Sequence, residues 1–275
     1  MGRYRQQQQV PTAEVDAWQD RRFVTALARG LTVLHCFRPS DRWLPHQELA
    51  RRTGLPPATV SRLTFTLTAL GYLRHRAQTG EYALSPAVLA LGFSALSQFD
   101  LARTARPLMA DLADHTQAAV SLGMRHGTSM VYVAHCRSAA RLILGLDVGT
   151  RLPLAETAMG RAWWVAATPG LRQRVARLLQ AENPQAWPQR ERMLRAAEAD
   201  HARRGYVVSE GEWERDISAV GVGLDLGDGR DPLALTVGGA STRLQGALLH
   251  QDFAPALVHC AQAVVALIQS GDLVD

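Results

Sequence analysis

The sequence has no lysine, few cysteines and no apolar run long enough to cross a membrane. All 30 basic residues are therefore arginine, which is more typical of a GC-rich genome than of selection for particular contacts. Three cysteines in 275 residues argue against a disulfide framework and favour a reducing cytoplasm. Because the N-terminus is polar and no membrane-length run follows, we expect neither a secretory signal nor a membrane partner.

Each cysteine directly follows a histidine, in the pairs His35-Cys36, His135-Cys136 and His259-Cys260. The pairs are far apart in the chain and lack the clustered spacing of a zinc site. We therefore expect no metal ion and no cofactor. Cys36 and Cys260 fall in apolar helical stretches, where a buried thiol is the usual role.

Common catalytic motifs are also missing. The chain has no Gly-x-Ser-x-Gly elbow, no HExxH and no P-loop. The glycine-rich GVGLDLG at 221–227 leads into a strand and an Asp-Gly turn, whereas a dinucleotide loop needs a helix. We expect no catalytic residues. The alternative is an enzyme or a protein–protein adaptor in the second half, with a basic first half that binds non-specifically.

Positive charge is concentrated in the first third of the chain. Residues 1–95 contain 12 Arg against 6 Asp and Glu, whereas residues 96–275 contain 18 Arg against 19 Asp and Glu. Cations that replace the counterions of a nucleic acid supply most of its non-specific affinity for a protein. The first third is therefore the expected nucleic-acid-binding part.

The same region has the pattern of a winged helix-turn-helix. A short helix over 45–53 breaks at Gly54, and a second helix starts at the Pro56-Pro57 pair and ends at Gly71. Strand-like segments at 72–75 and 82–85 follow, joined by a polar turn that ends at Gly80. A glycine between two helices permits a left-handed turn, which swings the second helix across the first.

The second helix is amphipathic. Its apolar stripe is Val60, Leu63, Leu67 and Leu70, and its opposite face carries Thr59, Ser61, Arg62, Phe65 and Thr66. A preceding helix over 23–37 is expected to pack Leu27, Leu31 and Leu34 inward. Such a helix pair also occurs in proteins that never touch DNA, but the basic wing 74–76 favours DNA. The residues expected at DNA are Gln47, Pro57, Thr59, Ser61, Arg62, Thr66, Arg74 and Arg76.

The remainder predicts an α+β domain with an antiparallel sheet. Helices are expected over 86–99 and 104–116, and strands at 118–125, 129–137 and 140–147. Helices over 157–168, 170–181 and 188–204 come next. Strands at 206–209, 217–226 and 232–237 and helices over 242–250 and 253–269 complete the pattern, with a hairpin turn at 228–229.

From residue 23 to residue 268, the chain resembles the IclR family of bacterial transcriptional regulators. The first half carries the resemblance in RGLTVLHCF, ELARRTGLPPATVSRLTFTLTALGYL and GEYALSPAVLALG. The second half carries it in LPLAETAMGRAWW, RRGYVVSEG and ISAVGVGLDLGDGRDPLALTVGGASTRL. Departures occur near the expected cavity, with Asp216 where Gly is common and Gly223 where Pro is common.

The resemblance implies an N-terminal winged helix-turn-helix, a linker helix and a C-terminal GAF- or profilin-like antiparallel-sheet domain. The expected boundaries are a disordered arm at 1–20, DNA binding at 21–85, the linker at 86–100, and effector binding with oligomerisation at 101–275. The function implied is a ligand-responsive, sequence-specific DNA-binding regulator in the bacterial cytoplasm, associated with the nucleoid. It would act as a dimer or tetramer on a palindromic operator.

The effector implied is a small organic or aromatic acid, held between the sheet and the 157–168 helix. Thr157 is a plausible N-cap, and the free N–H groups of Ala158, Met159 and Gly160 would favour an anion. A Thr at this position can also do no more than cap its helix. The expected effector residues are Leu146, Thr157, Ala158, Met159, Gly160, Glu210, Asp216, Ala219, Thr236 and Gly238.

Overall fold

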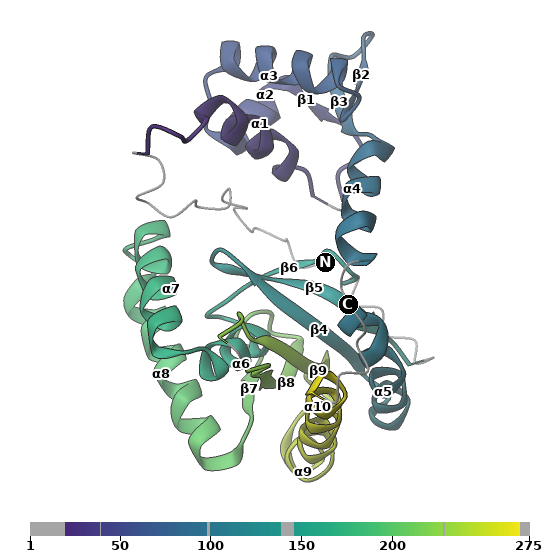
Figure 1. The fold of residues 1–275 in the computed structure, drawn as a ribbon, viewed down its shortest axis with the longest axis vertical. Coiled ribbons are helices and arrows are strands. Elements are labelled where there is room, and N and C mark those ends of the chain that lie inside the picture. The colour runs from purple at the N-terminus through teal and green to yellow at the C-terminus, as the bar shows by residue number, and fades with distance from the viewer. Residues whose placement is uncertain (1–19, 39, 98–99, 139–145, 228, 270–275) are drawn as a thin grey trace. The chain divides into compact units, whose positions relative to one another are not determined.

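The chain divides into two compact units, residues 1–98 and 99–275. The computed structural model describes residues 20–38, 40–97, 100–138, 146–227 and 229–269 (Figure 1). The expected arm at 1–20 lies almost wholly outside the described residues.

The first unit is the expected winged helix-turn-helix. Its helices are α1 (Thr25–His35), α2 (His46–Thr53) and α3 (Pro57–Ala69), and its strands are β1 (Leu44–Pro45), β2 (Leu73–Arg76) and β3 (Glu81–Leu84). The strands form an antiparallel sheet in the order β1-β3-β2. The sequence pattern missed β1 because a two-residue strand is too short to show alternation.

Gly54 makes the turn between α2 and α3. Its φ of +67° is left-handed, and its N–H donates to the Ala50 carbonyl at 3.0 Å. Gly80 adopts the same φ at the turn of the wing. Both glycines therefore occupy a backbone conformation that other residues adopt only at a cost.

Two leucines expected to pack inward lie at the surface of this unit. Leu27 and Leu31 are 62% and 46% exposed, so their expected inward packing is wrong, whereas Leu34 packs against the core. Leu70, the last residue of the expected apolar stripe, is 64% exposed. The buried side of α1 is centred instead on Gly30, where a Cβ would lie 3.9 Å from Leu63, and on Val33. Leu70 follows the last residue of α3, where the chain already turns away.

An ion-pair cluster ties α2 to the loop after α1. The Arg52 guanidinium pairs with Asp41, with Glu48 at 2.7 Å and with the Cys36 carbonyl at 3.1 Å. Hydrogen bonds from Arg51 and Arg52 lower the pKa of Glu48 to about 2. The cluster fixes the position of α2, against which α3 packs.

The helix after the wing, α4 (Pro86–Ser97), is apolar and exposed. Every residue in it is exposed or half-buried, with Leu89 at 74% and Phe93 at 70%. It belongs to the first compact unit. Its assignment as an interdomain linker stays a prediction.

The second unit is a six-stranded antiparallel sheet between two layers of helices (Figure 1). The strands run in the order β6-β5-β4-β9-β8-β7. Their bounds are Ala119–His126 (β4), Ser129–Cys136 (β5), Arg151–Pro153 (β6), Val207–Glu210 (β7), Ile217–Leu224 (β8) and Leu233–Ala240 (β9). The helices are α5 (Asp100–Thr116), α6 (Ala158–Ala166), α7 (Pro169–Glu182), α8 (Trp187–Arg204), α9 (Gly246–Leu248), the π-turn η2 (Leu249–Phe253) and α10 (Ala254–Gln269).

Strand alternation assigns the two faces of this sheet. In β9, Leu233, Leu235 and Val237 join the core beneath α5 and α10. The alternate residues Thr236 and Gly238 face the other side, beside α6. On the side that faces α6, β8 carries Gly221 and Gly223. A side chain would not fit there, since a Cβ on Gly223 would lie 2.3 Å from the Ala162 carbonyl oxygen. Small residues therefore let α6 pack directly onto the sheet.

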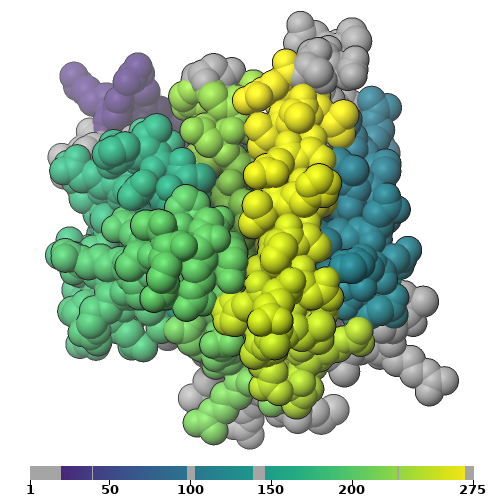
Figure 2. Space-filling model, turned by 90° about the horizontal axis from the view of Figure 1, so that it is seen from below, coloured from purple at the N-terminus to yellow at the C-terminus, as the bar shows by residue number. Residues whose placement is uncertain are grey.

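Residues 246–269 form one continuous helical segment, whereas two helices broken at 251–252 were expected. The π-turn η2 carries the chain through this point. Gly246–Gln269 is the one helix in the described residues that is long and apolar enough to cross a membrane. Core helices pass the same test, and here Phe253 and Leu257 are buried in the core. Figure 2 shows α10, in yellow, lying along the blue α5. That the chain contacts no membrane stays a prediction.

The edge beyond β5 differs from expectation. A strand was expected at 140–147, of which 140–145 lie outside the described residues and Leu146 and Asp147 belong to no strand. The edge strand is β6, whose Leu152 pairs with Met130 of β5. Three residues gave too short a pattern to identify β6 from the sequence.

Candidate functional site

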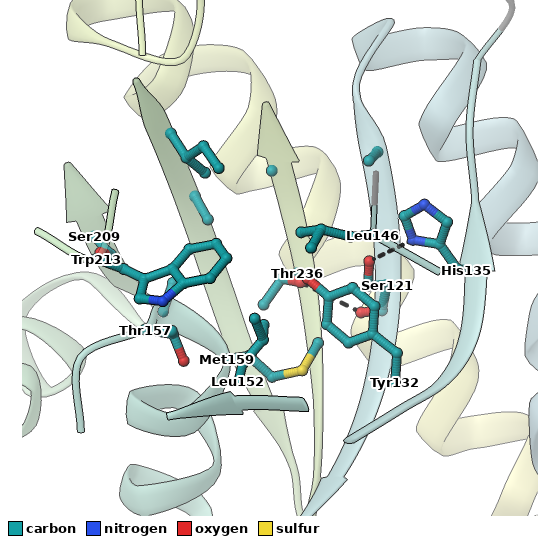
Figure 3. Close-up of a pocket in the computed structure, with 15 residues that line it drawn as sticks. Ser121, Tyr132, His135, Leu146, Leu152, Thr157, Met159, Ser209, Trp213 and Thr236 are labelled. Atoms are coloured by element: carbon teal, nitrogen blue, oxygen red, sulfur yellow. Dashed lines mark hydrogen bonds between the residues drawn. The ribbon is translucent and has the colours of Figure 1, made fainter. Parts of the chain in front are cut away.

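A pocket opens between the sheet and the N-terminus of α6 (Figure 3). The cavity volume is about 40 Å³. Seven of the ten expected effector residues line it: Leu146, Thr157, Ala158, Met159, Ala219, Thr236 and Gly238. Eight further lining residues were not in the expected set: Ala119, Ser121, Tyr132, His135, Leu152, Ser209, Trp213 and Ile217.

Three expected residues lie outside this lining. Gly160 packs against Leu154, whose carbonyl oxygen would lie 1.9 Å from a Cβ at that position. Glu210 ends β7, Asp216 lies just before β8, and both are exposed. The structure therefore does not bring these two carboxylates into the pocket wall.

Thr157 caps α6 as expected. Its Oγ1 accepts a hydrogen bond from Gly160 N at 3.2 Å and donates to the Pro153 carbonyl at 2.8 Å. The cap gives the Gly160 N–H its hydrogen-bond partner. The other two N–H groups of the first turn belong to Ala158 and Met159, which both line the pocket. The positive end of the helix favours negative charge here.

A bulge explains why two ring residues of β5 were missed. Leu122 pairs with Ala134 but Gly123 pairs with Tyr132, so Val133 is an extra residue in β5. One extra residue reverses the side on which the next residues point. Tyr132 and His135 consequently both line the pocket, whereas strict alternation would separate them. Their rings stack with centroids 5.7 Å apart and planes 14° apart.

His135 is held on both sides of its ring. Arg137 Nε lies 2.9 Å from His135 Nε2, and Ser121 Oγ lies 2.8 Å from Nδ1. Because an arginine N–H can only donate, Nε2 must accept, and the neutral ring carries its proton on Nδ1. Burial and then the charge of Arg137 lower the pKa of His135, which favours this neutral form.

Trp213 reaches the pocket from the irregular segment between β7 and β8. The buried Arg161 of α6 holds this segment through Glu212, to which its Nη1 donates a hydrogen bond of 2.5 Å. Arg161 also donates from the same Nη1 to the Val208 carbonyl in β7 at 3.1 Å. Its Nε donates 2.9 Å to the Ala155 carbonyl. One arginine thus connects the indole-bearing segment to the helix whose N-terminus forms the pocket wall.

In the first unit, α3 presents a polar face to solvent. Ser61, Arg62, Phe65 and Thr66 are exposed and Thr59 is half-buried. Gln47 on α2 and Pro57 at the start of α3 are also exposed. The Thr66 hydroxyl donates to the Arg62 carbonyl at 2.9 Å.

The wing supplies two further arginines. The Arg76 and Arg74 guanidinium carbons lie 4.1 and 5.4 Å from the centre of the Trp43 ring, and Arg76 also pairs with Glu81 at 3.3 Å. Both arginines are exposed. Stacking on an indole orients a guanidinium and leaves its N–H groups available.

The three cysteines are buried and unpaired. Burial raises the pKa of Cys36 to about 12 and that of Cys260 to about 11. Thiols with such pKa values are unreactive near neutral pH. Cys36 and Cys260 are thus the buried thiols that the sequence predicts. Of the three histidines that precede a cysteine, His135 lines the pocket.

A winged helix-turn-helix followed by a pocket-bearing sheet unit defines a ligand-responsive, DNA-binding transcriptional regulator. The IclR helix-turn-helix domain matches residues 26–77, and the bacterial transcriptional regulator IclR C-terminal domain matches residues 93–266. The chain belongs to the IclR family. A bacterial transcriptional regulator acts where the chromosome lies, which is the cytoplasm.

Individual relatives support this assignment along nearly the whole chain. The HTH-type transcriptional regulator TsaQ1/TsaQ2 of Comamonas testosteroni is 36% identical over 245 residues, which cover 88% of each chain. The Pca regulon regulatory protein of Pseudomonas putida is 32% identical over 252 residues, which cover 90% of this chain and 86% of that one.

Solved structures share the fold. An IclR family transcriptional regulator from Brucella abortus has a TM-score of 0.81 at 39% identity, over 90% of this chain and 93% of that one. An IclR homologue from Microbacterium hydrocarbonoxydans, complexed with 4-hydroxybenzoate, has a TM-score of 0.68 at 20% identity, over 89% and 99% of the chains.

Proposed function

We propose that the pocket binds a small aromatic acid and that binding changes the affinity of the protein for its operator. The carrying observation is the convergence, on one pocket, of aromatic side chains and the N-terminus of α6. The helix end is complementary to a carboxylate, and Tyr132 and Trp213 are complementary to a ring. The homologue that holds 4-hydroxybenzoate supports the same class of effector.

The small size of the cavity means that an aromatic acid can bind only if side chains move. A volume of about 40 Å³ is too small for a benzoate, so side chains must move when one binds. Met159 is the best candidate because its thioether chain is unbranched and adapts to its neighbours. Trp213 is the second, because it lies on an irregular segment.

Binding without turnover fits the polar groups of the pocket better than catalysis. Ser121 beside His135 has the composition of a nucleophile and its base. A base must accept the serine proton, however, and His135 Nδ1 already carries a proton because Nε2 accepts from Arg137. Deprotonating Ser121 would require a change of tautomer, so we assign the pair to ligand recognition.

For DNA, we propose that Ser61 and Arg62 read base edges in the major groove and that Arg74 and Arg76 contact phosphates. The exposed polar face of α3 and the exposed wing support these roles. Gln47, Pro57, Thr59 and Thr66 complete the proposed surface. A gel shift with an operator fragment and with random DNA, each at two salt concentrations, tests this. Equal affinity for the two DNAs at both salts would refute sequence-specific reading.

We also propose that the protein is at least a dimer on a palindromic site. One recognition helix reads only a few base pairs, and paired half-sites are the usual way to gain specificity. The exposed apolar side chains of α4, including Leu89 and Phe93, are the proposed contact. Light scattering at micromolar concentration should give more than one chain per particle, and Phe93→Asp should lower that mass. A wild-type monomer would refute the proposal.

Calorimetric titration with 4-hydroxybenzoate tests the effector proposal. The wild-type protein should bind it, and Ala158→Trp, which places bulk at the start of α6, should not. Thermal unfolding controls for the fold, because a ligand that binds only the folded state raises the melting temperature. If a panel of aromatic acids at millimolar concentration gives neither heat nor a melting shift with the wild-type protein, the effector proposal is wrong.

A further inference from the structure

Ser121 lies in the wall of the pocket with its hydroxyl hydrogen uncommitted. It is 3% exposed, and the described residues give its Oγ one partner, His135 Nδ1 (Figure 3). Since Nδ1 carries the ring proton, Ser121 Oγ accepts in this bond. The neighbouring Thr236 hydroxyl donates to the Ser121 carbonyl at 3.4 Å and is itself occupied. The Ser121 O–H is therefore left to donate into the cavity.

The arrangement depends on a residue outside the pocket. Arg137 is fixed by Nη2, which donates to the Leu146 carbonyl at 2.5 Å and to Asp147 Oδ2 at 3.1 Å. Held in this way, it presents Nε–H to His135. Without that donor, the imidazole could place its proton on Nε2 and accept at Nδ1. Ser121 would then donate to His135 and offer the cavity only lone pairs.

We propose that Arg137, through His135, makes Ser121 a hydrogen-bond donor, and that the pocket consequently selects acids with an acceptor oxygen opposite the carboxylate. The proposal rests on the function proposed above. Figure 3 places Thr157, at the start of α6, and Ser121 on different sides of the pocket. A carboxylate at α6 would thus direct the far end of an aromatic ring towards Ser121. Arg137 is a positioning residue, because it touches His135 and not the acid.

The Ser121 side of the pocket offers a hydrogen-bond donor, and this is why the pocket should distinguish one acid from another. An acceptor oxygen completes the chain from Arg137 through His135 and Ser121. A group that can only donate would leave the Ser121 hydrogen without a partner. A buried donor without a partner costs more than a missing contact at the surface. The pocket should therefore distinguish two para-substituted benzoates of similar size.

The test compares 4-formylbenzoate, whose carbonyl only accepts, with 4-aminobenzoate, whose amine chiefly donates. By calorimetry, the wild-type protein should bind the formyl compound about tenfold more tightly. Ser121→Ala should abolish the preference, and Arg137→Met should abolish or reverse it. Arg137→Lys retains a donor and should recover part of it. A merely structural role of Arg137 would weaken both compounds equally and leave their ratio unchanged, which overturns the proposal.

The histidine tautomer provides a second readout, independent of any acid. Nitrogen-15 NMR of the ligand-free protein should show His135 protonated on Nδ1, and Arg137→Met should shift the proton towards Nε2. A wild-type Nε2–H tautomer overturns the proposal whatever the binding data. Equal wild-type affinities for the two compounds overturn this inference and leave the proposed effector function standing. If the wild-type protein binds no benzoate at all, the proposed function fails and this inference falls with it.

Discussion

Gly123 on β4 faces the side chain of Met159 on α6 so closely that a Cβ on Gly123 would lie 2.1 Å from the methionine sulfur. Atoms cannot approach to that distance, so the glycine is what allows the thioether to lie against the sheet. Met159 lines the pocket, whereas Gly123 is not part of its lining. The position of the methionine, and through it the space in the pocket, therefore depends on a residue that need not touch an effector.

Gly123→Ala should narrow the pocket by displacing Met159 into it. The flexible end of the methionine can move, so we expect the fold to survive and the affinity for 4-hydroxybenzoate to fall about tenfold. Calorimetry measures the affinity and thermal unfolding checks the fold. Gly170→Ala is the matched control, because a Cβ there meets nothing within 4 Å. Adding Met159→Ala to Gly123→Ala should restore binding, and unchanged affinity in the single variant would contradict the prediction.

Part of this site was predictable from local pattern, and part from the resemblance to the IclR family. The Thr157 cap was identifiable because it precedes a helix start, and Thr236 and Gly238 were identifiable through the resemblance. Tyr132 and His135 were not, because the extra Val133 reverses the alternation at a point that no local signal marks. Trp213 was missed because it lies on an irregular segment, whose path is set by the buried Arg161 ion pair.

The same limit applies to the fold. Glycine turns and long amphipathic segments gave most elements, since Gly54 and Gly80 need a left-handed backbone. Strands of two or three residues, β1 and β6, exist only through pairing with partners distant in sequence. Leu27 and Leu31 were wrongly expected to pack inward because the apolar side chains of a helix do not reveal what covers them.

Arg62→Ala should lower affinity for the operator by about 1–3 kcal/mol if Arg62 reads a guanine, with a smaller loss on random DNA. The reason is that a bidentate contact to one base is lost while the phosphate contacts remain. Fluorescence anisotropy with both DNAs measures the two losses. Arg195→Ala, an exposed arginine of the second unit, is the control. Equal losses would make Arg62 a phosphate contact, and no loss would remove it from the interface.

Arg76→Gln should weaken binding to every DNA sequence and reduce the salt slope by about one, because one phosphate contact and its released counterion are lost. Trp43→Ala should weaken binding as well, since the indole lies 4.1 Å from the Arg76 guanidinium carbon and orients it. The measurement is log affinity against log salt for random DNA. An unchanged slope in Arg76→Gln would show that the wing does not touch the backbone.

Glu48 should make the stability of the first unit dependent on acid pH. Its folded-state pKa of about 2 lies below its usual value. Stabilisation by its bonds to Arg51 and Arg52 is thus complete above the usual pKa and is lost as the pH falls towards 2. Glu48→Gln should destabilise α2 by about 1 kcal/mol at pH 7 and by less at lower pH. Hydrogen exchange of α2 peptides reports this, and Glu191→Gln is the control. A pH-independent difference would exclude the ion pairs as its cause.

Ala158→Trp should separate effector response from DNA binding. Ala158 is 1% exposed at the start of α6 and lies in the pocket wall, within the second compact unit, while every proposed DNA contact lies in the first. An effector shifts an equilibrium only by its difference in affinity for the two states, so a variant that cannot bind it loses the shift. We expect wild-type operator affinity without acid and no change when 4-hydroxybenzoate is added. Bulk at a buried alanine can disturb packing, so the melting temperature and the operator affinity without ligand are measured first. The control is Gly170→Trp, at an exposed position of α7. A wild-type response to the acid in a folded Ala158→Trp protein would mean that the effector binds elsewhere.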